Sequence, residues 1–493
     1  MFQKLNKNIC KKHGMALSLV IITVMLIGCT SSSNKDEGNP VPIENAVAVY
    51  DQAVAQLSAE ENIYYKVTGT RMISDNGIST EESFTQLITY ENRGSKDFTS
   101  CVEEDLQIGS HAIKSFEFFS KDVAYFTTQG ANFQSEMTAD DYTDRYTPVA
   151  PVDSSLYAQI TGTKNRKAIT ISFEKAGSVA SWVEENGIAL IDSSATATLT
   201  ADGELRVSNY SVTYTKDALM ISLDVTVEIM NNAMPPLQIP DSSAYAPISD
   251  ISIPKTLERS CGYLTAINKI RSDYSETIFC EAFGDKRIQT ISLAADRTDS
   301  LSAELDTVMS VSNSSKAGAV TTYTKKELFK SGVYTYSVDG ITFENDSSVG
   351  KDIMQSYCDS LLIGTVMLPD YIGSVNVEEA DGVISISFLP TEEFANILAQ
   401  DACLSLYQNG TVLIEQALSY KTDEVTCYLT IDKASGYPLS SGFYYSGTYI
   451  VGGIPYQLSF QADQTYDYTA TAVDEEESTE PTEYTKTQET EVS

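Results

Sequence analysis

The sequence predicts a mainly β (α+β) protein made of two tandem curved antiparallel sheets, or half-barrels, each with an N-terminal helix and one inserted helix. Segments rich in Tyr, Val, Ile, Phe and Thr recur along the 493 residues, and these residues favour strands with one buried face. Amphipathic helical segments are too few to alternate with strands as a βαβ fold requires. The strand pattern also occurs twice, which indicates two copies of one module.

The repeat is clearest in a pair of predicted hairpins. Residues 119–133 (FSKDVAYFTTQGANF) match residues 329–343 (FKSGVYTYSVDGITF) without a gap. Each segment reads as a strand, a turn that carries glycine, and a second strand. Residues 169–173 (ITISF) match residues 384–388 (ISISF) in the same order further along the chain.

Helices are predicted at two places in each module. An apolar stripe with helical spacing opens the modules at 43–58 and 257–270, and a second amphipathic stretch follows the ITISF and ISISF strands at 176–186 and 391–400. The opening helices are followed by predicted strands at 63–72 and 83–92 in the first copy, and at 287–294 and 303–311 in the second.

Composition shifts divide the chain into five predicted segments. Pro and Ser are frequent at 234–255, as in a linker, and the last residues are dominated by Glu and Thr without an apolar period. The predicted segments are a signal peptide at 1–28, a flexible tether at 29–43, the first module at 44–245, the second module at 246–470 and a disordered acidic tail at 471–493.

The N-terminus has the parts of a secretory signal. Four lysines precede an apolar run at 15–27, which is shorter than the roughly 20 residues that a membrane-spanning helix needs. The run ends in Leu26-Ile27-Gly28-Cys29, which resembles the lipobox of bacterial lipoproteins. That resemblance implies lipid on Cys29 and anchoring to the extracytoplasmic face of the cell membrane. The alternative is an ordinary cleaved signal followed by a chance cysteine.

Charge and residue types exclude several classes of function. A formal net charge of −35 argues against nucleic acid as a partner, because nucleic-acid binding needs a basic surface. His111 is the only histidine beyond the signal. It follows Gly109-Ser110 at a predicted strand start, and we expect it to be a surface loop histidine. The cysteines form no C-x-x-C motif, and we expect most of them to be small buried hydrophobic residues. No motif indicates a metal or a cofactor.

The lipobox, the opening helix and the aromatic hairpins at 116–133 and 323–343 together resemble the LolA-like proteins, including the LppX/LprG-type lipoproteins. That resemblance implies a half-open barrel, lidded by helices, that holds a lipid or acylated ligand. The candidate cavity residues are Phe116, Phe118, Phe126, Phe133, Tyr334, Tyr336 and Phe343. The alternative interpretation is that each of them is simply a core residue.

Two other functions remain open at this point. The chain could be an envelope interaction or structural protein that binds a protein or a glycan, with some of its 29 tyrosines as stacking platforms. An enzyme is not expected, because the sequence lacks G-x-S-x-G, H-E-x-x-H, P-loop and dinucleotide-binding motifs. The sequence does not identify a protein partner.

Overall fold

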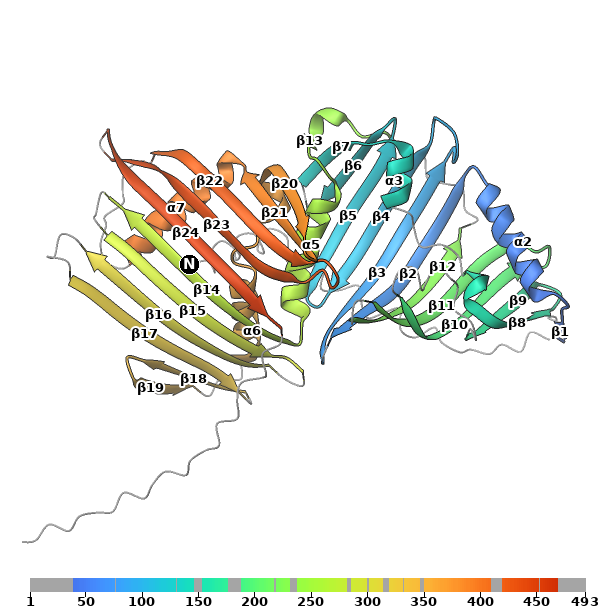
Figure 1. Cartoon of the computed structure of the whole chain (residues 1–493), viewed down its shortest axis with the longest axis horizontal. Helices are drawn as coiled ribbons and strands as arrows, with labels where there is room; N and C mark the ends of the chain where they lie inside the picture. Colours follow the sequence, from blue (N-terminus) through green and yellow to red (C-terminus); the bar gives the residue numbers. More distant parts are fainter. Residues whose placement is uncertain are drawn as a thin grey trace, which may run out of the picture.

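The computed structural model contains two large β-sheets joined end to end (Figure 1). It describes residues 39–75, 77–129, 131–145, 153–175, 188–216, 219–230, 237–281, 285–298, 301–313, 319–330, 332–345, 350–408, 419–451 and 453–468. The predicted signal peptide, Cys29, most of the tether, the 176–186 helix and the acidic tail lie outside the described residues.

The first sheet has thirteen strands, and all but one of its pairings are antiparallel. Their bounds are β1 (Val41–Pro42), β2 (Ile63–Asp75), β3 (Ile78–Glu91), β4 (Thr99–Ile108), β5 (His111–Ser120), β6 (Val123–Thr128), β7 (Ala131–Glu136), β8 (Tyr157–Lys164), β9 (Ala168–Lys175), β10 (Ala189–Thr200), β11 (Leu205–Lys216), β12 (Leu219–Ile229) and β13 (Ala246–Pro247).

The second sheet has eleven antiparallel strands. Their bounds are β14 (Lys269–Cys280), β15 (Asp285–Asp296), β16 (Ser302–Asn313), β17 (Ala319–Lys330), β18 (Val333–Val338), β19 (Ile341–Asn345), β20 (Ile372–Ala380), β21 (Val383–Pro390), β22 (Ser419–Asp432), β23 (Pro438–Val451) and β24 (Ile454–Asp467).

The two sheets have the same strand order. Without the two-residue strands β1 and β13, the first sheet runs β8-β9-β10-β11-β12-β2-β3-β4-β5-β6-β7, and the second runs β20-β21-β22-β23-β24-β14-β15-β16-β17-β18-β19. In both, the last strand of the module pairs with the first. This identity of topology confirms the mainly β fold class with two tandem sheets, and the domain boundaries themselves stay a prediction.

Five α-helices lie in the described part of the chain: α2 (Ala46–Ala59), α3 (Ala139–Arg145), α5 (Ser252–Ala266), α6 (Gly350–Leu362) and α7 (Glu392–Gln408). Helices α2, α5 and α7 were expected from the sequence, whereas α3 and α6 were not. Short 3₁₀ turns precede β8 (η1, Ser154–Leu156) and β20 (η4, Pro369–Tyr371). None of the described helices has the length and apolar character of a membrane span.

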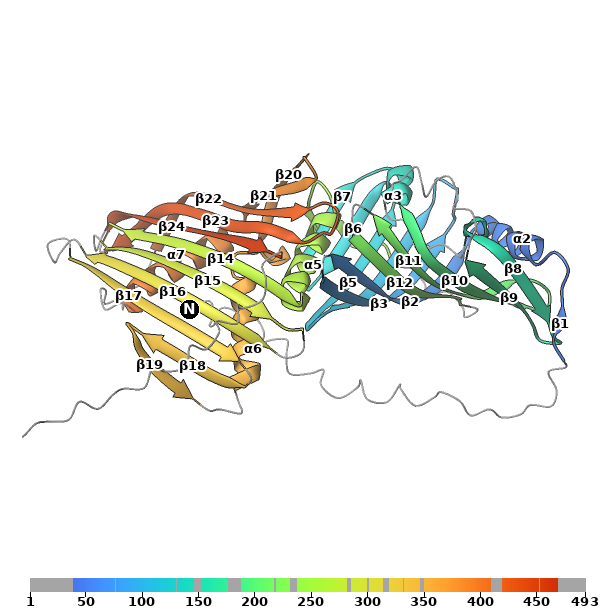
Figure 2. The ribbon, with the colours of Figure 1, turned by 60° about the horizontal axis from the view of Figure 1, so that its bottom comes forward.

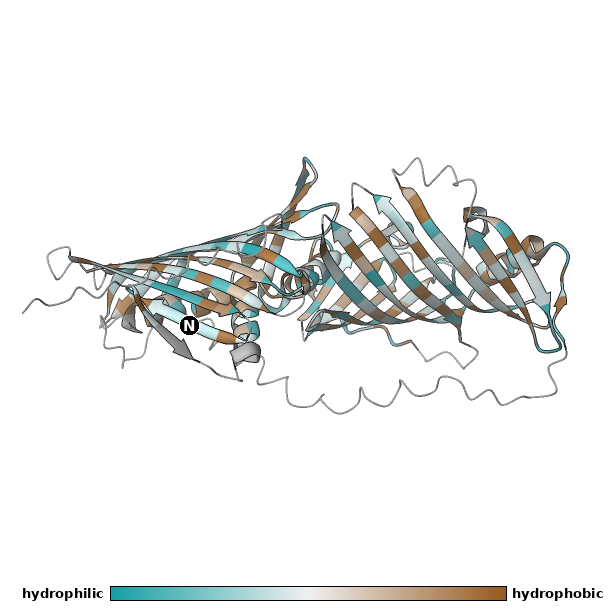
Figure 3. Ribbon diagram, turned by 90° about the horizontal axis from the view of Figure 1, so that it is seen from below, coloured by the Kyte–Doolittle hydropathy of each residue, from teal (hydrophilic) through white to brown (hydrophobic). Residues whose placement is uncertain are grey.

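Apolar and polar residues alternate along the strands, as Figure 3 shows by hydropathy. We call the face that packs against the helices the inner face of each sheet. In β4, for example, Leu106 and Ile108 are buried beneath α5, whereas Glu103 and Asp105 are exposed on the outer face. This period of two is the pattern of strands with one buried face.

Helix α5 lies between the two sheets (Figure 2). It begins at Ser252, five residues earlier than expected, where the Asp250 carboxylate accepts a 2.8 Å hydrogen bond from the Ser252 amide. It contacts β3, β4 and β5 of the first sheet and β23 of the second. The helix predicted to open the second module therefore also covers part of the first.

The segment before α5, although linker-like in composition, packs on the first sheet. Ala246–Pro247 forms β13 and pairs with β7, and the Tyr245 ring meets Tyr125 edge to face with centroids 5.1 Å apart. Leu237 joins the same small outer-face cluster. The connection between the sheets is thus held against the first sheet over its described residues.

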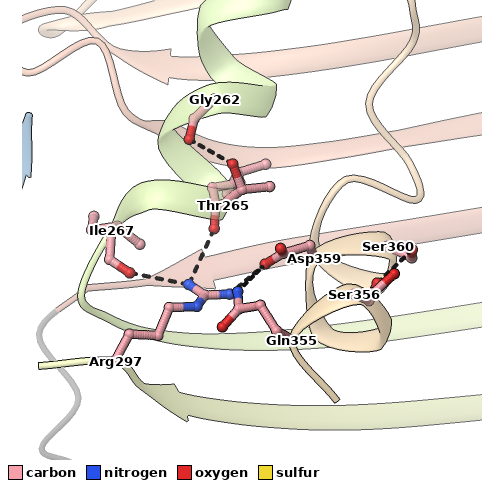
Figure 4. A network of polar contacts seen from close by, with 9 residues as sticks. Gly262, Thr265, Ile267, Arg297, Gln355, Ser356, Asp359 and Ser360 are labelled. Carbon is pink, nitrogen blue, oxygen red and sulfur yellow. Dashed lines mark hydrogen bonds and ion pairs between the residues drawn. The ribbon is translucent and has the colours of Figure 1, made fainter. Parts of the chain in front are cut away.

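Arg297 fixes the other end of α5 (Figure 4). Its guanidinium donates hydrogen bonds to the carbonyl oxygens of Ile267, at 3.0 Å, and Leu264, at 3.5 Å, and pairs with Asp359 of α6 at 2.9 Å. A cation beside the last carbonyl groups of a helix is favourable, because those groups have no partner within the helix. Arg297 therefore ties α5 and α6 together over the second sheet.

Candidate functional site

The helices divide the inner face of the first sheet into three parts. Under α2, Tyr50 packs edge to face on Phe173, with ring centroids 4.8 Å apart. Under α3 and α5, Tyr142 stacks on Phe119 at 4.5 Å, and Gly262 lies directly over Ile108. Between them no described helix lies across β2 and β12 (Figure 1).

We call this central part the middle strip. Its floor consists of a buried cluster of Ile63, Tyr65, Val67, Ile88, Tyr90, Val225 and Val227. Partly exposed apolar side chains pack against that floor: Leu57, Phe84, Phe98, Val102, Tyr210, Leu223 and Ile229. The middle strip is therefore a stretch of aromatic and aliphatic surface that retains some access to solvent.

Gly69 lies at the centre of the middle strip. A β-carbon at this position would lie 2.6 Å from the carbonyl oxygen of Asp224 and 2.8 Å from the ring of Phe84. Glycine is needed here because the Phe84 ring rests on the backbone of the neighbouring strand. The ring is thereby held across the strip.

At the α5 side of the strip the inner face becomes polar. Glu82 accepts hydrogen bonds from the Tyr263 hydroxyl and from Arg71, whose Nε also lies 3.2 Å from Glu82 Oε2. Lys255 pairs with Glu104 at 2.7 Å. The Tyr263 hydroxyl and the Lys255 ammonium of α5 thus meet acidic side chains that are almost completely buried.

Two of the buried glutamates of this region, Glu104 and Glu117, differ in their acid–base behaviour. Burial disfavours the charged form of Glu104, yet the nearby Lys255 and Arg259 outweigh that effect and lower its pKa. Burial raises the pKa of Glu117, although the Tyr142 hydroxyl donates it a 2.6 Å hydrogen bond. Glu104 is thus held as an anion, whereas Glu117 is more readily protonated.

His111 does not lie in a surface loop as expected. It is the first residue of β5, which agrees with the predicted strand start. Its side chain is only 25 % exposed, and its Nε2 lies 3.0 Å from Oε2 of Glu258 on α5. Gln129 donates to the same oxygen at 3.1 Å. The expectation is wrong because the partner of His111 lies 147 residues away in the sequence.

The predicted cavity residues of the first module lie on two faces of the sheet. Phe126 and Phe133 pair across β6 and β7 and are buried on the inner face. Phe118 pairs with Tyr125 on the outer face, where Phe116 stacks on it with centroids 6.3 Å apart. These four side chains therefore do not line one space, and ligand contact by either pair stays a prediction.

The candidates of the second module lie on one face. Tyr334 and Tyr336 stack with centroids 5.9 Å apart, and register places Phe343 opposite Tyr336. The Phe343 side chain lies outside the described residues. The Tyr334 hydroxyl donates a 2.5 Å hydrogen bond to the buried Glu327, which also pairs with Lys325 at 2.8 Å. Tyr334 is therefore anchored by a polar contact.

The residues of the middle strip were missed as candidates. Phe84, Tyr210 and Leu223 lie in segments that read as strands, and alternation alone places each on the apolar side of its strand. These three residues lie on β3, β11 and β12. The alternation does not reveal that these strands lie near one another in the sheet, where the order is β11-β12-β2-β3.

Two open hollows lie on the outer face of the first sheet. One has a volume of about 540 Å³, and its lining includes the exposed Ser194, Thr196, Ser211 and Asp224. The other, of about 370 Å³, is lined among others by Phe116, Glu103, Asp105 and Lys114. The larger hollow is also lined by Gly69, Phe84, Tyr210 and Val225, which belong to the middle strip.

All six described cysteines are buried, which confirms the expectation of buried hydrophobic residues for this part of the chain. Within the described residues no group of three or more His, Cys, Asp and Glu side chains could hold a metal ion.

No protein-family model matches the chain, and no curated protein is significantly similar to it. Among solved structures, LprF of Mycobacterium bovis aligns with 41 % of this chain and 98 % of its own, at 10 % identity and a TM-score of 0.23. A protein of unknown function from Nostoc punctiforme, of the DUF3598 family, aligns with 86 % of this chain and 100 % of its own, at 9 % identity and a TM-score of 0.12.

OccK5 of Pseudomonas aeruginosa aligns with 82 % of this chain and 97 % of its own, at 6 % identity and a TM-score of 0.10. At such TM-scores none of the three proteins gives this chain a family or a function. The case for a function rests on the geometry of the chain itself.

Proposed function

We propose that this protein is a membrane-anchored extracytoplasmic lipoprotein that binds a hydrophobic or lipid-like ligand on the inner face of its first sheet. The observation that carries the proposal is the middle strip, where Phe84, Tyr210 and Leu223 keep part of their apolar surface accessible beside a buried floor. Apolar sites with a few polar groups at one end are typical of small-molecule binding.

The layout of the strip fits an elongated apolar ligand. It lies between the cluster under α2 and the polar contacts of α5, so its two ends differ in chemistry. An acyl chain laid along the strip removes apolar surface from water, at roughly 25 cal/mol per Å². The ligand is expected to be amphiphilic, with its polar end toward Arg71, whose side chain is 31 % exposed.

Native mass spectrometry tests the ligand. The full chain carrying Cys29→Ala, secreted by a bacterial host and purified without detergent, is expected to carry lipid in about one equivalent. Leu223→Asp puts a charge on the strip and is expected to abolish this lipid, whereas the matched change Thr226→Asp on the outer face of β12 leaves it bound. Lipid retained equally by both variants contradicts the proposed position.

The anchor is tested separately. The wild-type chain grown with an alkyne-labelled palmitate is expected to incorporate the label and to fractionate with membranes, and Cys29→Ala is expected to lose both properties. Label that persists in Cys29→Ala shows that Cys29 is not the lipid attachment site.

The outer-face hollows favour a second candidate, a non-enzymatic envelope protein that binds a glycan or a protein. The larger hollow is rimmed by Ser, Thr, Asn and Asp side chains, and its lining also includes Phe84 and Tyr210. Polar groups beside aromatic rings suit a glycan or a peptide. Protein that is free of lipid, and that does not bind a fluorescent fatty acid, moves the assignment to this candidate.

A further inference from the structure

Helix α5 packs on two modules at once. On one side it contacts β23 and the 3₁₀ turn η4 of its own module, and on the other it contacts β3, β4 and β5 of the first sheet. Helix α2 contacts β11 and the turn η1, which are the matching elements of the first module. The two helices are therefore equivalent parts of the repeat.

The second side of α2, unlike that of α5, is uncovered. Eight of its fourteen residues are exposed along this side: Val47, Ala48, Asp51, Gln52, Ala55, Gln56, Ser58 and Ala59. The apolar Val47 is 42 % exposed to solvent. Ala55 lies four residues before the end of α2, as Gly262 lies four residues before the end of α5.

The second sheet has the surface that matches the one α5 covers. In the first sheet, α5 lies over Leu106, Ile108 and Ile113, which are at most 2 % exposed. The gapless match of the hairpins, extended back along the strand, aligns Ile113 with Tyr323. Met309 pairs with Tyr323 as Leu106 pairs with Ile113, and Val311 follows Met309 by two residues as Ile108 follows Leu106. These three side chains are partly exposed. We call them the end surface.

Helix α2 and the end surface lie toward opposite ends of the long axis of the molecule (Figure 1). From this arrangement we propose that α2 of one copy docks on the end surface of a second copy, repeating between chains the packing of α5 on the first sheet. The contact joins different surfaces of two identical chains, so it is heterologous and continues head to tail. It does not depend on the proposed ligand.

The contact chemistry is compatible with this occupant. Against the first sheet, α5 places Gly262 over Ile108 so closely that a β-carbon would lie 2.8 Å from Ile108 Cβ. The corresponding residues of the proposed contact are Ala55 and Val311. Ala55 carries the β-carbon that Gly262 lacks, so α2 lies slightly farther from β16 in the proposed contact than α5 lies from β4. Glu104 and His111, which pair with Lys255 and Glu258 of α5, correspond to Thr307 and Thr321. In the same register Lys255 and Glu258 correspond to Ala48 and Asp51 of α2, so the hydroxyl of Thr321 faces a carboxylate that can accept its hydrogen bond.

Disulfide trapping tests the proposal with two preparations of the full chain, each with Cys29→Ala to keep it in solution. One carries Ala55→Cys and the other Val311→Cys. Mixing them under mild oxidation is expected to give a crosslinked dimer that neither gives alone, and the double variant is expected to give a ladder of oligomers. The control pairs Ala55→Cys with Val308→Cys, which is 43 % exposed on the outer face of the same strand.

Sedimentation of a second variant, Ala55→Arg, keeps the proposal testable if a cysteine variant does not fold. Ala55→Arg, at an exposed helix position, is expected to lower self-association in sedimentation experiments by at least about tenfold, a change of about 1.4 kcal/mol. A chain that stays monomeric at all concentrations, equal trapping in the control pair, or a dimer trapped by Ala55→Cys alone each overturns the proposal.

Discussion

Lys255, on the helix that precedes the second sheet, places its ammonium 2.7 Å from Oε2 of Glu104 on the inner face of the first sheet. The carboxylate side chain is 2 % exposed and the lysine side chain 25 %. Because Gln86 also donates to Glu104 at 2.6 Å, the acidic group is almost fully satisfied by side chains from both modules. The sheets are thus joined by a buried ion pair as well as by apolar contacts.

Breaking this pair is expected to destabilise the protein. Lys255→Met leaves Glu104 buried without its ion-pair partner, with Arg259 as the remaining nearby cation. Removing one partner of a buried ion pair typically costs about 3–5 kcal/mol. We expect the free energy of unfolding, measured by urea denaturation at pH 7, to fall by about 3 kcal/mol. Adding Glu104→Gln to Lys255→Met is expected to restore part of the loss.

The matched control is an exposed ion pair between β4, the strand of Glu104, and its neighbour β5. Lys114 lies 2.9 Å from Asp105, but both side chains are more than 60 % exposed. Lys114→Met is expected to change the free energy of unfolding by less than about 1 kcal/mol. Equal effects of the two lysine substitutions contradict the view that burial makes the Lys255 pair important.

Gly262 tests how closely α5 approaches the first sheet. In an exposed helix, replacing glycine by alanine stabilises by about 1 kcal/mol. Here the added β-carbon lies 2.8 Å from Ile108 Cβ, so we expect Gly262→Ala to lower the free energy of unfolding by about 1 kcal/mol instead. Ser58→Ala at an exposed position of α2 is the control, and its expected effect is slightly stabilising. A gain of stability in Gly262→Ala shows that α5 is not tightly seated.

Local pattern predicts much of the fold but not the relation between the modules. The match of 119–133 with 329–343 predicts the hairpins that become β6–β7 and β18–β19, because strand and turn preferences act over a few residues. Lys255 falls at the end of the predicted linker, and Glu258 reads as the solvent face of an amphipathic helix. Their partners, Glu104 and His111, are about 150 residues away, so no local pattern reveals them.

The candidate site was predicted less well than the fold, for a reason visible in β5. Phe116, Phe118 and Phe119 all look like core residues, yet adjacent positions of a strand point to opposite faces. Phe119 is the inner residue, beneath Tyr142, and Phe118 is the outer one, beside Tyr125. Since both faces are covered here, hydrophobicity does not tell which residues face the helices.

The thiols are expected to be unreactive in the folded protein. Burial raises the pKa of Cys101, Cys358, Cys403 and Cys427 to about 12, so almost no thiolate is present at pH 8. In the Cys29→Ala chain, Ellman's reagent is expected to react with none of the six described cysteines until urea unfolds the protein. Rapid reaction of even one of these six thiols in native buffer contradicts the buried assignment.

Asp401 on α7 is expected to make the free energy of unfolding fall as the pH rises. Burial raises its pKa to about 6, above the value of about 3.9 in unfolded chains. The folded state therefore holds the proton more tightly, and this residue lowers the free energy of unfolding progressively as the pH rises from about 4 through 6. Asp401→Asn removes that loss and is expected to stabilise by about 1–3 kcal/mol at pH 7 and hardly at all at pH 4.

The measurement is urea denaturation of wild type and Asp401→Asn between pH 4 and 8, so that all other titrating groups cancel in the difference. Glu393→Gln in the exposed first turn of the same helix is the control. A carboxylate there is favoured by the helix dipole, so its removal is expected to cost up to about 1 kcal/mol at pH 7. An Asp401→Asn difference that does not grow with pH shows that this carboxylate is well solvated or paired, and that α7 lies less closely on β22–β24 than the structure has it.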